Sequence, residues 1–129
     1  MKKLMILILL AVMLLTACGQ DKENDQEAVY VNITAEEAKR IMDTEDGYII
    51  LDVRTQEEYD EGHIPGAILI SHEEITEKAE EVLTDKDQLI LVYCRSGRRS
   101  KLAAEALVEL GYTNIKEFGG IIDWPYETE

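Results

Sequence analysis

Apolar and polar residues alternate along the chain in blocks that predict β-strands and α-helices in turn. Residues 29–33 alternate between apolar and polar positions, as a strand does. Residues 48–53 and 88–93 are nearly continuous apolar runs of strand length. Such runs are typical of strands buried on both faces in a parallel sheet. A shorter apolar run at 68–70 predicts another strand, and a last strand is predicted near 114–118.

Segments with helical spacing separate these predicted strands. Capping boxes, in which Ser or Thr precedes Glu by three residues, predict helix starts at Thr34, Thr55 and Ser71. A further helix is predicted over 100–110, and Gly119-Gly120 leads into a short final element. Because strands and helices alternate, the sequence predicts an α/β fold with a parallel sheet covered by helices on each side.

Residues 1–17 have a different character, with a basic start followed by an apolar run. This pattern is typical of a secretory signal peptide, and the run is too short for a good transmembrane helix. Leu15-Thr16-Ala17-Cys18 resembles the lipobox of bacterial lipoproteins. The resemblance implies cleavage before Cys18, lipidation of that cysteine, and export to the outer face of a bacterial cell membrane by lipid anchor only. An ordinary signal peptide followed by an incidental cysteine is the alternative.

Composition divides the remaining chain into a tether, residues 18–28, and one folded domain, residues 29–129. The formal net charge of −14 argues against nucleic acid as a partner and against electrostatic binding to anionic lipid. Within this acidic chain, four of the 13 Lys and Arg residues lie between positions 95 and 101. A charge run is often a solvated face, but this one adjoins a cysteine, and we interpret it as functional.

Cys94 stands where the predicted strand 88–93 turns into the predicted helix 100–110. The first turn of a helix offers unpaired backbone N–H groups and the positive end of the helix dipole. Together with the neighbouring arginines, these groups favour an anion such as a thiolate. If Cys18 carries lipid, Cys94 has no disulfide partner within the chain. Cys94 is therefore the candidate nucleophile.

Four motifs, in their order and spacing, resemble the single-domain form of the rhodanese (thiosulfate sulfurtransferase) family. They are Leu51-Asp52-Val53-Arg54, then Glu57-Glu58-Tyr59 with Gly62-His63-Ile64-Pro65-Gly66-Ala67, then Tyr93-Cys94-Arg95-Ser96-Gly97-Arg98-Arg99-Ser100, and finally Gly119-Gly120-Ile121 with Trp124. The resemblance covers roughly residues 30–126. It implies a three-layer α/β domain with a mostly parallel, five-stranded central sheet flanked by helices. It also implies that Cys94 becomes a persulfide and passes its outer sulfur to cyanide or a thiol.

The same resemblance implies a small anionic sulfur donor, such as thiosulfate, bound by the loop after the cysteine. The substrate-binding residues would be Arg95, Ser96, Gly97, Arg98, Arg99 and Ser100, of which Arg99 is expected to pair back into the scaffold. Ser96 stands where some thiosulfate enzymes of the family carry Lys or Arg, so the natural donor is left open.

Three polar residues outside the loop are expected to support the scaffold. Asp52 and Arg54 are expected to form an ion pair at a strand end, and His63 to fix its turn by hydrogen bonding. No cofactor is expected. No metal site is expected either, because two histidines and one free cysteine at these spacings make no ligand set.

Two other function classes compete with sulfur transfer. Phosphatases and arsenate reductases use a Cys-x5-Arg loop, whereas Arg99 is the fifth residue after Cys94 and Ser100 is the sixth. The shorter loop favours a single sulfur atom over a tetrahedral oxyanion. A non-enzymatic lipoprotein that senses oxidants through Cys94, or binds a partner, is the remaining alternative.

Overall fold

Five strands form one sheet in the order β1-β5-β4-β2-β3, and every pair of neighbours is parallel. The computed structural model describes residues 29–129, so the predicted signal peptide (1–17) and the predicted tether (18–28) lie outside the described residues. The strands are β1 Val31–Asn32, β2 Ile49–Asp52, β3 Ile68–Leu69, β4 Ile90–Cys94 and β5 Ile115–Gly120. The α/β fold with a five-stranded parallel sheet is therefore confirmed.

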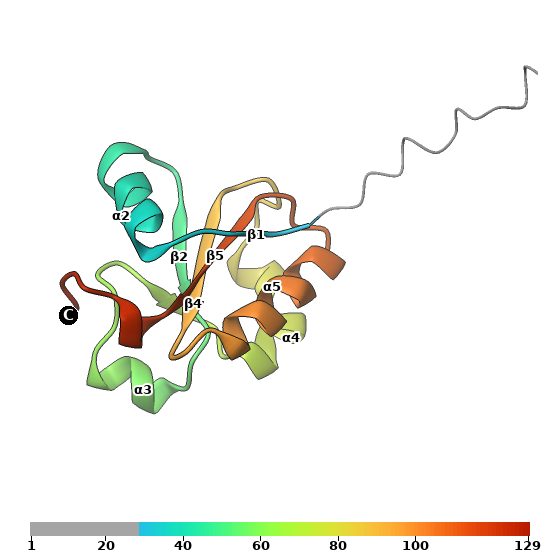
Figure 1. Ribbon diagram of the computed structural model, residues 1–129. Helices are drawn as coiled ribbons and strands as arrows, with labels where there is room; N and C mark the ends of the chain where they lie inside the picture. Colours follow the sequence, from blue (N-terminus) through green and yellow to red (C-terminus); the bar gives the residue numbers. More distant parts are fainter. Residues whose placement is uncertain (1–28) are drawn as a thin grey trace, which may run out of the picture.

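Helices cover both faces of this sheet, which gives three layers (Figure 1). They are α2 Ala35–Thr44, α3 Gln56–Glu61, α4 Ile75–Val82 and α5 Arg98–Glu109, with single 3-10 turns at His72–Glu74 and Ile121–Asp123. Neighbouring strand residues point to opposite faces. Leu51 and Val92 belong to the core beneath α4 and α5, whereas Ile50 and Leu91 belong to the core beneath α2. None of these helices has the length and apolarity needed to span a bilayer.

Two of the three predicted capping boxes are present. The side chains of Thr34 and Thr55 accept hydrogen bonds from the N–H groups of Glu37 and Glu58, and both glutamates bond back to the cap residue. The box predicted at Ser71 is wrong. There the Glu74 N–H donates to the backbone carbonyl of Ser71 at 2.7 Å, which closes a 3-10 turn and leaves no donor for the hydroxyl.

Other differences from the predicted elements are small. The first strand pairs with β5 over only two residues, because it lies at the edge of the sheet and has one neighbour. The last helix begins at Arg98 rather than residue 100, since Gly97 takes the N-cap position. Strand β4 lies at the centre of the order, and Cys94 is its last residue. The fold therefore places the candidate nucleophile at the carboxyl end of the central strand, where parallel sheets bind ligands.

Candidate active site

Cys94 joins the central strand to a short loop, residues 95–97, that leads into α5. Its side chain is fully buried, with 0% of the residue exposed. The loop and the end of β5 cover it. Among residues 29–129 it is the one free cysteine.

The loop curls around the sulfur atom of Cys94. The Gly97 N–H donates to Sγ at 3.0 Å, and Sγ lies 3.5 Å from Ser100 Oγ. Gly97 has φ +108°, in the left-handed region that favours glycine, and this turn aims its N–H inward. Burial raises the pKa of the Cys94 thiol. Hydrogen bonds from the backbone N–H groups of Ser100, Gly97 and Ser96 lower it, and the net pKa lies below the ordinary value.

Ser100 and Glu117 lie on the buried side of this sulfur. Ser100 is fully buried, and its hydroxyl hydrogen-bonds to Glu117 Oε2 and to the carbonyl of Gly97, the latter at 3.1 Å. Glu117 on β5 is only 2% exposed and also accepts the Gly119 N–H at 3.0 Å. Sequence reasoning missed Glu117. The available signal was an acidic residue two positions before Gly119, in a strand that also contains Lys116.

The end of β5 packs directly against the backbone of the loop. A Cβ atom on Gly120 would lie 2.0 Å from the Arg95 carbonyl oxygen and 2.6 Å from Ser96 Cα. The Ile122 N–H donates to the same Arg95 carbonyl at 3.2 Å. Only glycine permits this close approach at position 120. The sequence pattern indicated for Gly119-Gly120 only a connection to a short final element, but Gly120 also lets β5 pack against the loop.

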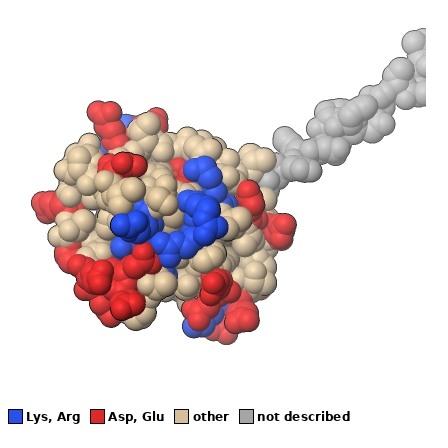
Figure 2. All heavy atoms as spheres, turned by 60° about the horizontal axis from the view of Figure 1, so that its bottom comes forward, with Lys and Arg blue, Asp and Glu red and all other residues tan. Residues whose placement is uncertain are grey.

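Basic side chains surround the loop on the outside. Arg95, Arg98 and Lys101 are exposed, and Figure 2 shows blue Lys and Arg side chains gathered on this face among red acidic ones. Within the described part of the chain, neither Arg95 nor Arg98 forms an ion pair. Both guanidinium groups are therefore available to an anion.

Arg99 points back into the scaffold, as expected. Its Nη1 and Nη2 donate to the two carboxylate oxygens of Glu58 at 2.9 and 3.0 Å. This pair joins the start of α5 to α3. The Arg99 guanidinium and the Thr55 contacts hold the pKa of Glu58 at about 2, against an ordinary 4.5, although partial burial opposes the shift.

Asp52 and Arg54 form the expected ion pair at the end of β2. Arg54 Nη2 lies 2.7 Å from Asp52 Oδ2, and Arg54 Nε lies 2.9 Å from Oδ1. Arg54 also donates to the Gly62 carbonyl at 2.7 Å. The Tyr93 hydroxyl donates to Asp52 at 2.6 Å, and burial with this bond raises the pKa of Tyr93. The pair thus links β2, β4 and the turn after α3.

His63 lies in that turn and contacts α3. Its Nδ1 is 2.9 Å from the Tyr59 carbonyl, and its ring stacks on the Tyr59 ring at 3.8 Å between centroids. Neither His63 nor the Asp52–Arg54 pair hydrogen-bonds to the sulfur of Cys94. The structure therefore brings the loop residues together around Cys94 and leaves these three residues in a separate supporting network.

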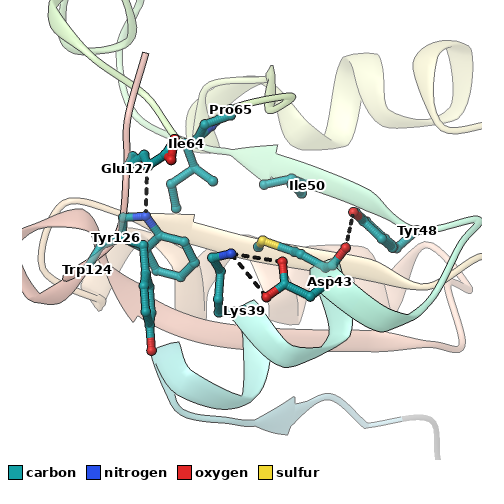
Figure 3. Close-up of a pocket in the computed structure, with 10 residues that line it drawn as sticks. Lys39, Asp43, Tyr48, Ile50, Ile64, Pro65, Trp124, Tyr126 and Glu127 are labelled. Atoms are coloured by element: carbon teal, nitrogen blue, oxygen red, sulfur yellow. Dashed lines mark hydrogen bonds and ion pairs between the residues drawn. The ribbon is translucent and has the colours of Figure 1, made fainter.

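A cavity of about 270 Å³ lies elsewhere, between α2, the start of β2, the turn at Ile64-Pro65 and the C-terminal segment (Figure 3). No residue of the 94–100 loop lines it. Several of its polar groups already have partners: Lys39 bonds Asp43, the Tyr48 hydroxyl bonds the Met42 carbonyl, and Trp124 Nε1 bonds the Glu127 carbonyl. Residues 29–129 contain no cluster of three or more His, Cys, Asp and Glu side chains placed to hold a metal ion. The loop around Cys94 is therefore the candidate active site.

Comparison with known proteins gives the same picture. The model of the rhodanese-like domain family matches residues 34–125. The thiosulfate sulfurtransferase PspE of Escherichia coli (strain K12) is 41% identical over 73 residues, 57% of this chain and 70% of that protein. The putative sulfur carrier protein YrkF of Bacillus subtilis (strain 168) is 34% identical over 112 residues, 86% of this chain and 60% of that protein.

Solved structures agree with these relatives. A rhodanese with anions from E. coli superimposes with a TM-score of 0.60 at 36% identity, over 64% of this chain and 96% of that one. The rhodanese-like domain of the Alr3790 protein from Anabaena sp. gives a TM-score of 0.71 at 29% identity, over 76% and 77% of the two chains. From its loop, its sheet and these matches, the chain belongs to the family of rhodanese-like domains.

Proposed function

We propose that this protein is a sulfurtransferase that carries sulfane sulfur on Cys94. The observation that supports this best is the sulfur position, buried and facing the N–H of Gly97 at 3.0 Å within a loop of inward-facing N–H groups. Such a loop stabilises one negatively charged sulfur atom, whether a thiolate or the outer atom of a persulfide.

The reaction has two steps that balance without an added oxidant or reductant. The Cys94 thiolate attacks the outer sulfur of thiosulfate or a similar anionic donor. A sulfur–sulfur bond forms to Cys94, the bond within the donor breaks, and sulfite leaves with the electron pair. Cyanide or a thiolate then attacks the outer sulfur of the persulfide, and the Cys94 thiolate is regenerated.

The exposed arginines have the right place to bind the donor. Arg95 and Arg98 are exposed at the loop in a chain with a net charge of −14, so they attract and orient an anion near the sulfur. Arg99 is committed to Glu58 and acts through the scaffold. Because Cys94 has no exposed surface, we infer that the loop side chains move aside when the donor enters.

Phosphoryl transfer is the less favoured reaction. In a Cys-x5-Arg loop the arginine closes on the oxyanion, but here the sixth residue after the cysteine is Ser100, buried against Glu117. Ser100 is held by the Glu117 carboxylate, so no arginine closes on a phosphate or arsenate at that position. Oxidant sensing through Cys94 is a second candidate, favoured by the lowered thiol pKa.

We further propose that the protein is lipidated on Cys18 and anchored outside a bacterial cell membrane. This proposal is supported by the sequence around Cys18 alone, since those residues lie outside the described part of the chain.

The deciding experiment is the mass of the protein after incubation with thiosulfate. We expect a gain of one sulfur atom on the peptide that contains Cys94, and its loss, with thiocyanate formation, on addition of cyanide. A Cys94→Ser control should gain none. Turnover of an aryl phosphate that depends on Cys94 would overturn the assignment. Absence of both activities would favour the sensing role.

A further inference from the structure

Glu117 is a buried carboxylate beneath the sulfur-binding loop, and the proposed sulfur transfer makes no direct use of it. Its Oε2 accepts hydrogen bonds from the Ser100 hydroxyl and the Gly119 N–H, and its Oε1 lies 3.5 Å from Nζ of Lys101. The Lys101 side chain is 50% exposed, so solvent weakens its compensation of the buried charge. A carboxylate in this position acts strongly on whatever shares its hydrogen bonds.

Ser100 is the residue that Glu117 shares with Cys94. A serine hydroxyl has one proton to donate and can accept further hydrogen bonds. In the structure, the Cys94 thiol lies 3.5 Å from Ser100 Oγ as donor, and Ser100 in turn bonds Glu117 Oε2. With the thiol protonated, the hydrogen bonds therefore run in one direction, from Cys94 through Ser100 to Glu117.

When Cys94 ionises, its thiolate and the Glu117 carboxylate compete for the single hydroxyl proton of Ser100. A thiolate is stabilised by Ser100 only if the hydroxyl turns its proton toward sulfur. The Glu117 carboxylate is the stronger acceptor, because its charge sits on oxygen and sulfur is a weak acceptor. Ser100 then leaves the anionic sulfur to the backbone N–H groups of the loop, Gly97 foremost.

We propose that Glu117 is a positioning residue that acts on Cys94 through Ser100 by keeping the hydroxyl proton away from the sulfur. The anionic sulfur is thereby held less tightly than the loop alone would hold it. For the thiol this opposes ionisation. For the persulfide, in the part of the proposal that rests on the sulfur-transfer function, it favours release of the outer sulfur to an acceptor.

Other charged or titratable groups also surround Cys94 and Glu117. They come from α5, α3 and the ends of β2 and β4, and comprise Lys101, Arg99, Glu58, Asp52, Arg54 and Tyr93. Arg99 raises the stability of an anionic Cys94 through space, and Glu58 neutralises Arg99 in turn. Lys101 loses its carboxylate partner when Glu117 is replaced, but the other groups keep their contacts and shift the parent and the variants alike.

The effect on the Cys94 thiol is tested without any sulfur donor, by measuring the rate of alkylation by iodoacetamide across a pH series. The alkylation midpoint is the pH at which this rate is half its maximum. Alkylation is followed on the peptide that contains Cys94, in the full chain. Glu117→Gln removes the charge and keeps the shape, so we expect its alkylation midpoint to fall by about one pH unit. A midpoint that is unchanged or higher would overturn the proposal. The matched control is Glu105→Gln, an exposed carboxylate on α5, which should leave the midpoint in place.

Ser100→Ala in the parent protein is a second test, and it does not require a Glu117 variant to fold. In the parent, the Ser100 proton is committed to Glu117, so its removal should move the midpoint by less than about 0.3 pH unit. In the Glu117→Gln background the same change should raise the midpoint by about one unit. A rise of that size already in the parent would show that Ser100 donates to sulfur there, and would contradict the proposal.

The persulfide part is measured as the rate at which pre-formed persulfide passes sulfur to cyanide. We expect Glu117→Gln to discharge about tenfold more slowly than the parent. An equal rate would overturn this part. If the parent itself forms no persulfide, the sulfur-transfer function fails, whereas the alkylation midpoints still decide the role of Glu117.

Discussion

Arg99 and Glu58 form a two-pronged ion pair that fastens the first turn of α5 to α3. The two nitrogens of the guanidinium lie 2.9 and 3.0 Å from the two carboxylate oxygens, and the side chains are only 19% and 24% exposed. Two parallel hydrogen bonds between partly buried partners are worth more than a surface pair. The pair therefore contributes to the stability of the segment that shapes the sulfur site.

This pair makes stability depend on pH in acid. The pKa of Glu58 falls from 4.5 to about 2 on folding, so the folded form binds the proton less readily than the unfolded form. The contribution is complete above about pH 4.5 and is lost as the pH falls toward about 2. We expect urea unfolding at pH 7 to show Glu58→Gln less stable by roughly 1–2 kcal/mol. A difference that persists undiminished at pH 2.5 would contradict this account.

Replacing Cys94 by serine should abolish sulfur transfer and leave the fold intact. The two side chains have nearly the same shape, so the buried site acquires no cavity, and the hydroxyl can still meet the Gly97 N–H. Thiocyanate formation and the thermal unfolding midpoint are the two measurements. More than about a tenth of the parental rate would mean that another residue performs the chemistry.

Glycine substitutions separate steric contact from backbone conformation. Gly120→Ala should destabilise by about 3 kcal/mol, because its Cβ would lie 2.0 Å from the Arg95 carbonyl oxygen. Gly119→Ala meets nothing within 4 Å, and should lose only the roughly 1 kcal/mol associated with its φ of +89°. Chemical unfolding of both variants decides, and equal losses would disprove the distinction.

Gly97→Val should reduce persulfide formation strongly. The reason is the φ of +108°, which a β-branched residue resists. Crowding of the sulfur has little weight, since the atoms nearest to an added Cβ belong to Gly119 and Lys101. Mass spectrometry after thiosulfate treatment measures the effect, and normal persulfide formation would show that the inward-facing N–H of Gly97 is dispensable.

The exposed arginines should affect donor binding more than turnover. Arg95→Gln and Arg98→Gln are each expected to raise KM for thiosulfate severalfold with little change in kcat, and to weaken the salt dependence of kcat/KM. Arg40→Gln on the exposed side of α2 is the charge-matched control. If that control raises KM equally, general surface charge rather than position is responsible.

The proposed lipid anchor is tested by Cys18→Ala in cells. The parent should partition with membranes, and the variant should lose lipid and change its migration. Identical fractionation and migration of the two proteins would reject the lipoprotein proposal.

Much of the fold could be predicted because local signals and tertiary structure agree. Residues 90–93 of the predicted strand are all buried, and the boxes at Thr34 and Thr55 form their reciprocal hydrogen bonds. The box at Ser71 failed because a backbone carbonyl competed for the same donor. That competition depends on a 3-10 turn, which the Ser-x-x-Glu pattern does not reveal.

The candidate site was predictable only in part. The loop from Cys94 to Ser100 is continuous in sequence, so its residues could be assigned together. Glu117 lies 17 positions after Ser100 and reaches it only because β5 pairs with β4. The burial of Cys94 likewise depends on the approach of Gly120 to Arg95, a contact between distant segments.

The central place of β4 has a consequence for local motion. Its backbone is bonded on both sides, to β2 and to β5, whereas the loop after Cys94 has exposed residues on one side. Amide protons of β4 should therefore exchange with solvent only through global unfolding, and those of Arg95 and Ser96 through small openings. Cys94 is thus attached to the slowest-exchanging part of the chain. The loop after it can open and close many times before β4 unfolds.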